Sequence, residues 1–391
     1  MPNQIIKISK EEESKLRQQL ENRHDPEAER MKRFLAMPDL SRTVGNPINE
    51  IVDRILAQPD FKDFDVIEVP EIVSADMSFD LFDFPKDHPA RSKSDTYYVD
   101  ESNILRTHTT VMWNYYLAQE DVKKRMANNE SVGSFSYGKV YRKDEIDRNH
   151  MNVFHQMDGW YLTPKDKATI GIPELEKVLI DIAKAVFGPD VKYRFNPDTF
   201  PYTHPSLEME IDPSTGSGQV GSGQTKWVEV LGSGVVKGKV LENHGVDSSE
   251  WNGWAFGFGL ERLAIISMEL PDIRLLWSQD ERVKKQLKLG QKFVEVSKYP
   301  PIVRDISFVV NKDFVPNNYF DLIRDIGGDL VEEVELIDKY ENAEKFGSDK
   351  ISYTYRIIYR SIDRTLQIEE IEPLQQEVYD RTKKEFDAEV R

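Results

Sequence analysis

Residues 138–160 read GKVYRKDEIDRNHMNVFHQMDGW, a stretch that is not typical of an ordinary protein core. An apolar run that ends at Tyr141 leads to Arg142, and a charged loop then precedes the triplet Phe-His-Gln at 154–156. We expect the guanidinium of Arg142 to emerge at a strand end, where its planar fork suits phosphate oxygens. Phe154 offers a flat face to a purine. Taken alone, the stretch also fits a surface hairpin.

A second stretch, residues 253–274, reads GWAFGFGLERLAIISMELPDIR. Gly257 and Gly259 stand just before an apolar helix that bears Glu261 and Arg262, and glycines let a backbone approach another group closely. An arginine buried at the start of such a helix is costly without a partner. An anionic or aromatic ligand is therefore expected beside it.

Composition sets outer limits on the function. The chain has 391 residues, 39% of them hydrophobic, and therefore predicts a folded globular protein. Cysteine is absent, which excludes disulfides, thiolate catalysis and cysteine-type zinc sites. No apolar run approaches the roughly 18 residues of a spanning helix, and the N-terminus lacks a signal-peptide pattern. The net charge of −17 means that any nucleic-acid binding must rest on local clusters of Lys and Arg.

The chain divides into three predicted parts. Residues 1–45 form a charged arm, in which Ser9 and Glu12 make a capping box that opens a polar helix, and a second helix ends near Met37. Because the apolar face of this arm is thin, we expect a solvated appendage rather than a binding element.

Residues 46–287 and 292–391 form the other two predicted parts. In the first, residues 46–56 and 173–188 predict helices, and the Gly/Ser-rich residues 212–225 predict an exposed hairpin loop. In the second, the order strand-helix-strand-strand-helix is typical of a small ferredoxin-like sandwich.

Both opening stretches resemble known motifs. GKVYR…FHQ resembles motif 2 of the class II aminoacyl-tRNA synthetases, and GFGLER resembles their motif 3. More narrowly, HPARSKSDTYYV, LRTHTT, FPYTHPSLEMEI and WVEVLGSG resemble the catalytic chain of phenylalanyl-tRNA synthetases, and the tail from SKYPPIVRDISFVV resembles their anticodon-binding domain. The resemblance implies an α+β fold: an antiparallel-sheet catalytic domain with flanking helices, followed by a ferredoxin-like sandwich. Both domains on one chain are the arrangement of the single-chain mitochondrial type, which implies a monomer. A homodimer is the alternative, because motif 1 of this fold usually makes a dimer interface and the helix NPINEIVDRIL could do so.

The resemblance also implies an ATP site and a reaction. Arg142 and Arg262 are the implied catalytic residues, and Arg142 would hold both the α-phosphate and the amino-acid carboxylate. The implied ATP-binding residues are Arg142, His150, Phe154, Glu229, Gly257 and Arg262. Glu229 is also the implied ligand for Mg²⁺, although a strand carboxylate that faces solvent is the alternative. Amino acid and ATP would give an aminoacyl adenylate, which a tRNA 3′ end would then consume.

The implied amino-acid pocket combines polar residues with aromatic walls. Its residues are His108, Thr110, Arg142, Gln156, Asp158, Phe200, Tyr202, Thr203 and Ala255. Four positions depart from the usual family pattern: Thr110 stands for Ser, Trp113 for Gln, Asp158 for Glu and Tyr202 for Phe. The loss of a polar contact at Trp113 puts the strict choice of phenylalanine in doubt. A buried Tyr hydroxyl usually finds a protein partner, so we expect that of Tyr202 to point away from the substrate.

Three arginines of the C-terminal part are candidates for tRNA contacts. These residues, Arg356, Arg360 and Arg364, lie among Tyr353, Tyr355 and Tyr359, and aromatic stacking beside arginine is a common way to hold RNA. An ordinary sheet surface with salt bridges is the alternative.

Function and location are predicted as follows. We expect a phenylalanine–tRNA ligase with ATP, Mg²⁺, L-phenylalanine and tRNA(Phe) as its ligands, with no membrane contact, in the cytoplasm or, alternatively, an organelle matrix. The alternatives are an adenylating paralogue for another amino acid and a non-catalytic paralogue that binds tRNA for regulation.

Overall fold

The computed structural model describes residues 3–213, 227–295 and 299–391, which form two compact units. The first unit comprises Met1–Arg142, Val153–Leu270 and Leu287–Phe293. The second comprises Lys143–Asn152, Pro271–Gln286 and Val294–Arg391. The arm thus groups with the first unit, and two internal segments group with the second. Compactness and the family's domain limits are different criteria, so the boundaries 1–45, 46–287 and 292–391 stay a prediction.

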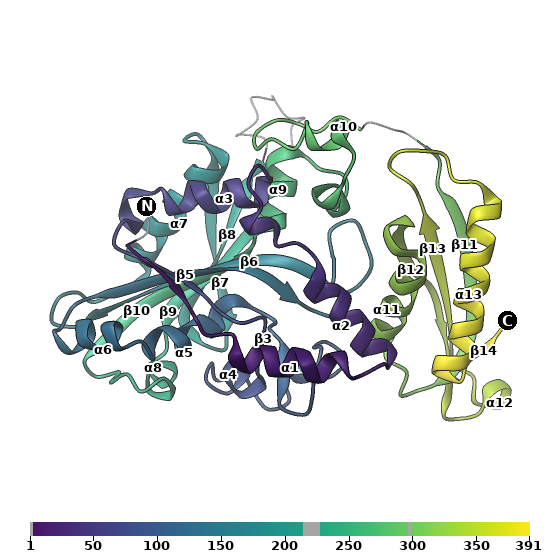
Figure 1. Cartoon of the computed structure of the whole chain (residues 1–391), viewed down its shortest axis with the longest axis horizontal. Helices are drawn as coiled ribbons and strands as arrows, with labels where there is room; N and C mark the ends of the chain where they lie inside the picture. Colours follow the sequence, from purple (N-terminus) through teal and green to yellow (C-terminus); the bar gives the residue numbers. More distant parts are fainter. Residues whose placement is uncertain (1–2, 214–226, 296–298) are drawn as a thin grey trace. The chain divides into compact units, whose positions relative to one another are not determined.

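An eight-stranded sheet forms the centre of the first unit (Figure 1), in the order β1-β2-β5-β6-β10-β9-β8-β7. Its strands are β1 (Ile5–Lys7), β2 (Asp65–Glu68), β5 (Val132–Tyr141), β6 (Val153–Pro164), β7 (Lys192–Phe200), β8 (Thr203–Asp212), β9 (Val228–Val236) and β10 (Trp251–Gly259). Pairing is antiparallel except for β1 with β2 and β2 with β5. A separate pair joins β3 (Ile72–Ser74) and β4 (Asn103–Leu105).

Helices cover both faces of this sheet. Figure 1 shows α3 (Pro47–Leu56), α7 (Ile172–Phe187) and α9 (Leu260–Met268) together on one face, where they pack against one another. The other face carries α4 (Ala75–Phe79), α5 (Met112–Leu117), α6 (Glu120–Ala127) and α8 (Gly238–Asn243). The predicted helices at 46–56 and 173–188 are confirmed, and Asn46 caps the first by accepting a hydrogen bond from the amide of Ile48.

The N-terminal arm corrects two expectations. Its helices are α1 (Glu11–Glu21) and α2 (Pro26–Ala36). The capping box at Ser9 is wrong, because Lys10 occupies the N-cap position and its side chain caps nothing. The solvated appendage is also wrong: Leu20, Ala28 and Met31 are fully buried, so the apolar face is thin but complete.

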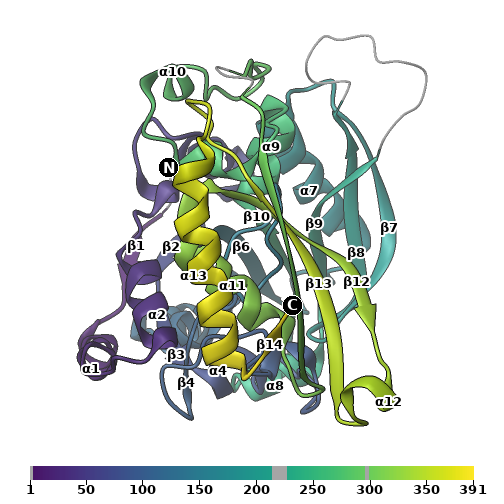
Figure 2. The ribbon, with the colours of Figure 1, turned by 90° about the vertical axis from the view of Figure 1, so that its right-hand side faces the viewer.

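The second unit contains a four-stranded sheet in the order β12-β13-β11-β14. Its elements are α10 (Glu281–Lys284), β11 (Ile302–Asn311), α11 (Pro316–Gly327), β12 (Val331–Tyr340), α12 (Ala343–Phe346), β13 (Lys350–Tyr359), α13 (Ile368–Phe386) and β14 (Glu389–Val390). Helices α11 and α13 lie side by side against the sheet (Figure 2). The predicted ferredoxin-like order of strands and helices is confirmed.

Strands β8 and β9 pair as the sequence predicts. The predicted loop at 212–225 that joins them lies, from residue 214 on, outside the described residues. Within the described part of the chain, no helix is both long and apolar enough to cross a membrane.

The burial of the arm predicts its contribution to stability. Met31→Ala removes a side chain that is 0% exposed, and a buried Met→Ala change costs roughly 2–5 kcal/mol. Val44 is 91% exposed, so Val44→Ala should change the free energy of unfolding by no more than about 0.5 kcal/mol. Tryptophan fluorescence should follow the transition, because five of the six tryptophans lie in the first unit. Equal stability of the two variants would contradict a docked arm.

Candidate active site

Arg142 follows the last residue of β5, as its position after an apolar strand predicted. Its Nε donates to the carbonyl of Thr107 at 3.1 Å, and its guanidinium lies over the ring of Phe154, 5.1 Å from the centroid. The register of β5 with β6 makes this contact possible, because Val140 pairs with Phe154. The hairpin thus brings the charged fork and the aromatic face together.

A buried carboxylate lies further along β6. Asp158 accepts hydrogen bonds from Thr109 Oγ1 at 2.6 Å and Thr110 Oγ1 at 3.0 Å. Burial raises the pKa of Asp158 to about 6, against the opposing effects of the two hydroxyls and of Arg142. The carboxyl is therefore mostly ionised at neutral pH and lies where a cationic group would find an acceptor.

His108 precedes the short 3-10 turn Thr109–Val111, and one of its ring nitrogens has no hydrogen-bond partner among the described residues. Its Nε2 lies 3.0 Å from the carbonyl of Ser78 and must donate, so Nδ1 is an acceptor. Burial, together with the charge of Arg142, lowers the pKa of His108 to about 4, and the ring stays neutral. Among the described residues, neither Nδ1 of His108 nor Oε1 of Gln156 has a hydrogen-bond partner, although both atoms are buried.

The floor of the site is made of glycines on β9 and β10. A Cβ at Gly257 would lie 1.9 Å from Oδ1 of Asp158, and one at Gly232 would lie 2.6 Å from the ring of Phe200. A Cβ at Gly234 would lie 2.5 Å from Cβ of Thr203. The predicted residue Ala255 pairs with Gly234 in the same row. These positions have no room for larger side chains because the pocket's own residues occupy it.

Aromatic rings form one wall. Phe200 and Tyr202 stack with their centroids 6.1 Å apart, and Phe82 meets Tyr202 edge to face at 6.0 Å. Phe84 stacks on His108 at 6.2 Å. Sequence reasoning missed Phe82 and Phe84, for which the run FDLFDFP at 79–85 was the available signal.

Two pocket expectations change on inspection. Trp113 is fully buried and stacks on Trp160 at 4.4 Å, so it fills space behind the pocket in place of a polar contact. The hydroxyl of Tyr202 makes no hydrogen bond to any residue in the described ranges, contrary to the expected protein partner. Burial and the negative charge of Asp158 raise its pKa.

Arg262 lies in the first turn of α9 (Leu260–Met268) and is half exposed, not buried as the apolar helix suggested. Its Nη1 lies 3.5 Å from Oε2 of Glu229, whose side chain is also half exposed. Among the described residues, no group of three or more His, Asp or Glu side chains could hold a metal ion by itself.

A buried network behind the site was not predicted. Glu261 accepts from the amide of His155 at 2.8 Å and contacts the imidazole Nδ1 at 2.6 Å. Nε2 accepts from the amide of Leu40 at 2.9 Å, which favours a neutral ring, and lies 3.3 Å from Asp39, which favours a charged one. Burial alone would lower the pKa of His155, but Glu261 and Asp39 outweigh it and raise the pKa to about 9. Because Glu261 precedes Arg262 and His155 follows Phe154, this network ties together the two strand-and-helix ends that carry the predicted purine-binding residues.

The remaining candidates belong to the second unit. His150 contacts Asp147 through Nδ1 at 2.8 Å. Each candidate arginine has an acidic partner: Arg356 with Asp305, Arg360 with Glu332 and Arg364 with Glu370. Tyr353, Tyr355 and Tyr359 lie in the core on the other face of β13, so they offer no stacking surface beside the arginines.

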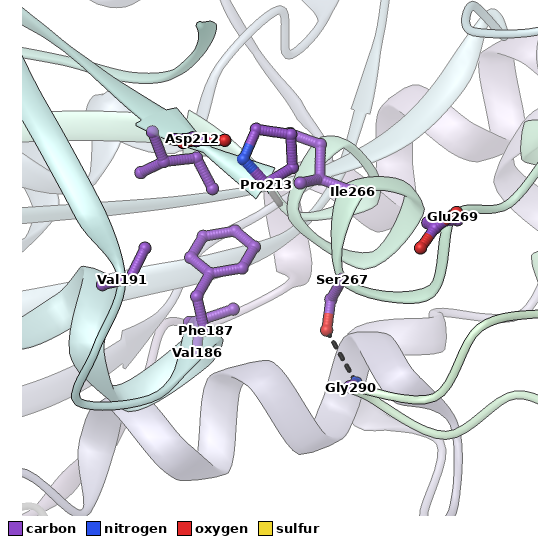
Figure 3. A pocket seen from close by; sticks show the side chains of 10 residues that line it. Val186, Phe187, Val191, Asp212, Pro213, Ile266, Ser267, Glu269 and Gly290 are labelled. Atoms are coloured by element: carbon purple, nitrogen blue, oxygen red, sulfur yellow. Dashed lines mark hydrogen bonds between the residues drawn. The ribbon is translucent and has the colours of Figure 1, made fainter. Parts of the chain in front are cut away.

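A small cavity lies elsewhere in the first unit, between the ends of α7, β8 and α9 (Figure 3). Its volume is about 30 Å³, which is room for a water and not for an amino acid or a nucleotide. Ser267 closes one side by accepting a hydrogen bond from the amide of Gly290 at 2.9 Å. No predicted site residue lines it.

Comparison with known proteins gives consistent matches. Residues 35–287 match the tRNA synthetases class II core domain (F), and residues 297–391 match the ferredoxin-fold anticodon binding domain. The chloroplastic/mitochondrial phenylalanine–tRNA ligase of Arabidopsis thaliana is 39% identical over 83% of this chain and 72% of the plant protein. The mitochondrial phenylalanine–tRNA ligase of Mus musculus is 35% identical over 80% and 72%. The phenylalanine–tRNA ligase alpha subunit of Lactobacillus johnsonii is 40% identical over 62% and 68%.

The His155 network predicts a pH-dependent stability. A folded pKa of about 9 against 6.5 when unfolded gives stability that is complete below pH 6.5 and is lost as the pH rises through 9. The advantage of the wild type over His155→Gln should fall by on the order of 3 kcal/mol over that window, from about 1.4 kcal/mol per pKa unit. Urea unfolding from pH 6 to 10 measures it, with the exposed His24→Gln as the control. A constant advantage would show that His155 stays neutral in the folded protein, with Nε2 accepting from the amide of Leu40.

Proposed function

The chain belongs to the phenylalanine–tRNA ligases of the class II aminoacyl-tRNA synthetases, and from this premise we propose how its site performs the reaction. The protein joins L-phenylalanine to ATP as phenylalanyl adenylate and passes the phenylalanyl group to tRNA(Phe). The observation that carries the proposal is the placement of Arg142, which lies against Phe154 and on the same hairpin as the carboxylate of Asp158.

Arg142 acts on the phosphate in the first step. A carboxylate oxygen of phenylalanine attacks the α-phosphorus of ATP, and a new O–P bond forms. The bond between the α-phosphorus and the oxygen that bridges it to the β-phosphate breaks, and pyrophosphate leaves. Negative charge grows on the α-phosphate oxygens, and a guanidinium already held by Thr107 stabilises that charge without reorganising. Phe154 and Arg262 then hold the adenine, and Gly257, whose missing side chain makes room for Asp158, approaches the nucleotide through its backbone.

The substrate ammonium is held by acceptors. Nδ1 of His108 and Oε1 of Gln156 are buried without partners in the described part of the chain, and Asp158 carries the negative charge. An ammonium has three N–H donors, and Thr110 keeps the carboxylate oriented. These acceptors fit an amino acid's polar end, and in its absence they leave buried atoms unpaired at a cost.

Rings and small residues receive the phenyl group. Phe200 and Tyr202 form the wall, while Thr203 and Ala255 complete the pocket over the glycine floor. The replacements Thr110 and Asp158 keep a hydroxyl and a carboxylate in contact with each other. Trp113 stacks behind the pocket, so its substitution alters shape and not charge.

ATP and Mg²⁺ are the ligands that the family implies. Glu229 supplies one half-exposed carboxylate, which suits an ion held mainly by nucleotide phosphates. Such an ion would neutralise phosphate charge, and Arg262 would exchange its contact with Glu229 for the nucleotide.

The tRNA contacts remain proposals on surface geometry. Arg356 lies on the face of β13 opposite the buried tyrosines, and Arg360 directly follows the end of this strand. Exposed ion pairs such as those of Arg356 and Arg364 are weak because solvent screens them, so phosphate can replace their carboxylates. By the family resemblance alone, we propose His150 as a contact of the ATP γ-phosphate; its own contact in the structure is with Asp147.

Location and assembly follow from the relatives. The plant and mouse proteins are named for organelles, so an organelle matrix is the proposed location, and the cytoplasmic expectation gains no support from them. Both family domains occur on this one chain, so we propose a monomer that needs no partner subunit. The alternatives, a paralogue for another amino acid and a non-catalytic one, lose support because the two motif arginines and the acceptor set are present.

Arg142→Ala and Arg262→Ala should each abolish adenylate formation in a folded protein. Removing a fixed charge contact costs about 2.7–4 kcal/mol of transition-state stabilisation, or roughly 10²–10³ in rate. ATP–pyrophosphate exchange with phenylalanine measures the loss. Arg54→Ala, which breaks an exposed pair with Glu50 on α3, is the control. Exchange near the wild-type rate in Arg142→Ala would remove this residue from the reaction.

The hydroxyl of Tyr202 should weaken discrimination against tyrosine. Because it has no partner among the described residues, it can bond to the para-hydroxyl of a tyrosine substrate. Tyr202→Phe should therefore raise the ratio of kcat/KM for phenylalanine over tyrosine by tenfold or more, which corresponds to about 1.4 kcal/mol. Tyr98→Phe is the control, since its hydroxyl already donates to the carbonyl of Arg91 at 2.7 Å. An unchanged ratio would place the Tyr202 hydroxyl away from the substrate.

A further inference from the structure

Glu71, between β2 and β3, lies at the centre of a polar cluster behind Arg142. Its Oε1 accepts from the hydroxyl of Tyr141 at 2.8 Å and lies 3.2 Å from Nζ of Lys139. Its backbone carbonyl accepts from the amide of Arg106 at 2.9 Å. One residue therefore contacts both the end of β5 and the segment that leads to His108.

The same segments position Arg142 directly. The amide of Tyr141 donates to the carbonyl of Arg106 at 3.0 Å, and Arg142 donates to the next carbonyl, that of Thr107. The buried guanidinium of Arg106 donates to the carbonyl of Lys139 at 2.7 Å. Any shift of Glu71 would move the strand end from which Arg142 projects.

The arm reaches this cluster through helix α1. Arg17 donates to Oε2 of Glu71 at 2.6 Å and, through Nε, to Glu13 at 2.8 Å. Glu13 is 2% exposed, so the two carboxylates meet one guanidinium at a largely buried position. Removing that charge would leave two poorly solvated carboxylates facing each other, a costly arrangement that a shift of Glu71 would relieve.

Helix α2 makes a second, independent connection. Lys139 donates to the carbonyls of Met37 at 2.7 Å and Leu35 at 3.0 Å, which belong to the end of α2. The last carbonyls of a helix lack partners within it, and a cation there is favourable. Both arm helices thus hold β5 close to its end.

We infer that the N-terminal arm is a positioning element for the adenylation chemistry, and that Arg17 acts through Glu71 and Tyr141 to hold Arg142 in place. This inference rests on the proposed role of Arg142 at the phosphate. The match to the class II core begins at residue 35, so it assigns nothing to Arg17 or Glu13.

The test compares two ligands by calorimetry. Phenylalaninyl adenylate carries the α-phosphate, whereas phenylalaninol has the same ammonium and ring without it. Arg17→Met should weaken binding of phenylalaninyl adenylate about tenfold and that of phenylalaninol less than about twofold, since a tenfold change is about 1.4 kcal/mol. Lys32→Met, which removes an arm cation whose contacts are Glu29 and carbonyls of the arm, should change neither affinity.

A second variant guards against loss of folding. Tyr141→Phe removes only the hydroxyl that bonds to Glu71 and should show the same selective loss. An equal loss of affinity for both ligands, or an unchanged affinity for phenylalaninyl adenylate, would overturn the positioning role.

A double variant separates this inference from the proposed function. Arg142→Ala alone should strongly weaken the binding of phenylalaninyl adenylate. Adding Arg17→Met should weaken this binding no further, because the effects of substitutions at residues that act through one another are not additive. If Arg142→Ala has no effect, the proposed function of Arg142 fails together with the arm's role. If Arg142→Ala has its effect and the two losses add, only the arm's role fails.

Discussion

A guanidinium held at the end of β5 is the constraint on which the rest of the site depends. An arginine side chain in water is mobile, and a mobile charge would stabilise a transition state poorly. Here the carbonyl of Thr107 and the ring of Phe154 hold Arg142, and the β5–β6 register sets both contacts. Gln156 and Asp158 then follow at alternate positions of β6, so in the proposed function one hairpin would order phosphate, carboxylate and ammonium along its length.

The glycines in the floor of the site leave space for the side chains that form the pocket. Gly232, Gly234 and Gly257 lie in strands, where glycine is unfavourable because its unfolded chain has more freedom. The structure gives each a purpose, since a Cβ would collide with Phe200, Thr203 or Asp158. These glycines lower the stability of the strands, but they leave space for a ring and a buried carboxylate close to the sheet.

Most of the helices, strands and candidate site residues could be predicted from local motifs in the sequence. Arg142, Phe154 and Gly257 were visible because their spacing along a strand and a helix start is local, whereas Gly232 and Gly234 were not singled out. The Glu261–His155–Asp39 network was not, because it joins positions more than a hundred residues apart and no period links them. The arm was misjudged since a few buried residues on a charged helix suffice when the surface that receives them is formed elsewhere in the chain. Alternation along β13 already separates Arg356 from the tyrosines of the strand, and that signal could have excluded stacking at this residue.

A crystal structure of the protein with phenylalaninyl adenylate tests the central claim most directly. We expect the α-phosphate to lie within hydrogen-bond distance of Arg142 and the adenine to lie between Phe154 and Arg262. We also expect the ammonium to lie at Asp158 and Gln156, and the phenyl ring to lie against Phe200 and Tyr202. A ligand bound with its phosphate away from Arg142, or with its ring outside this aromatic wall, would contradict the account.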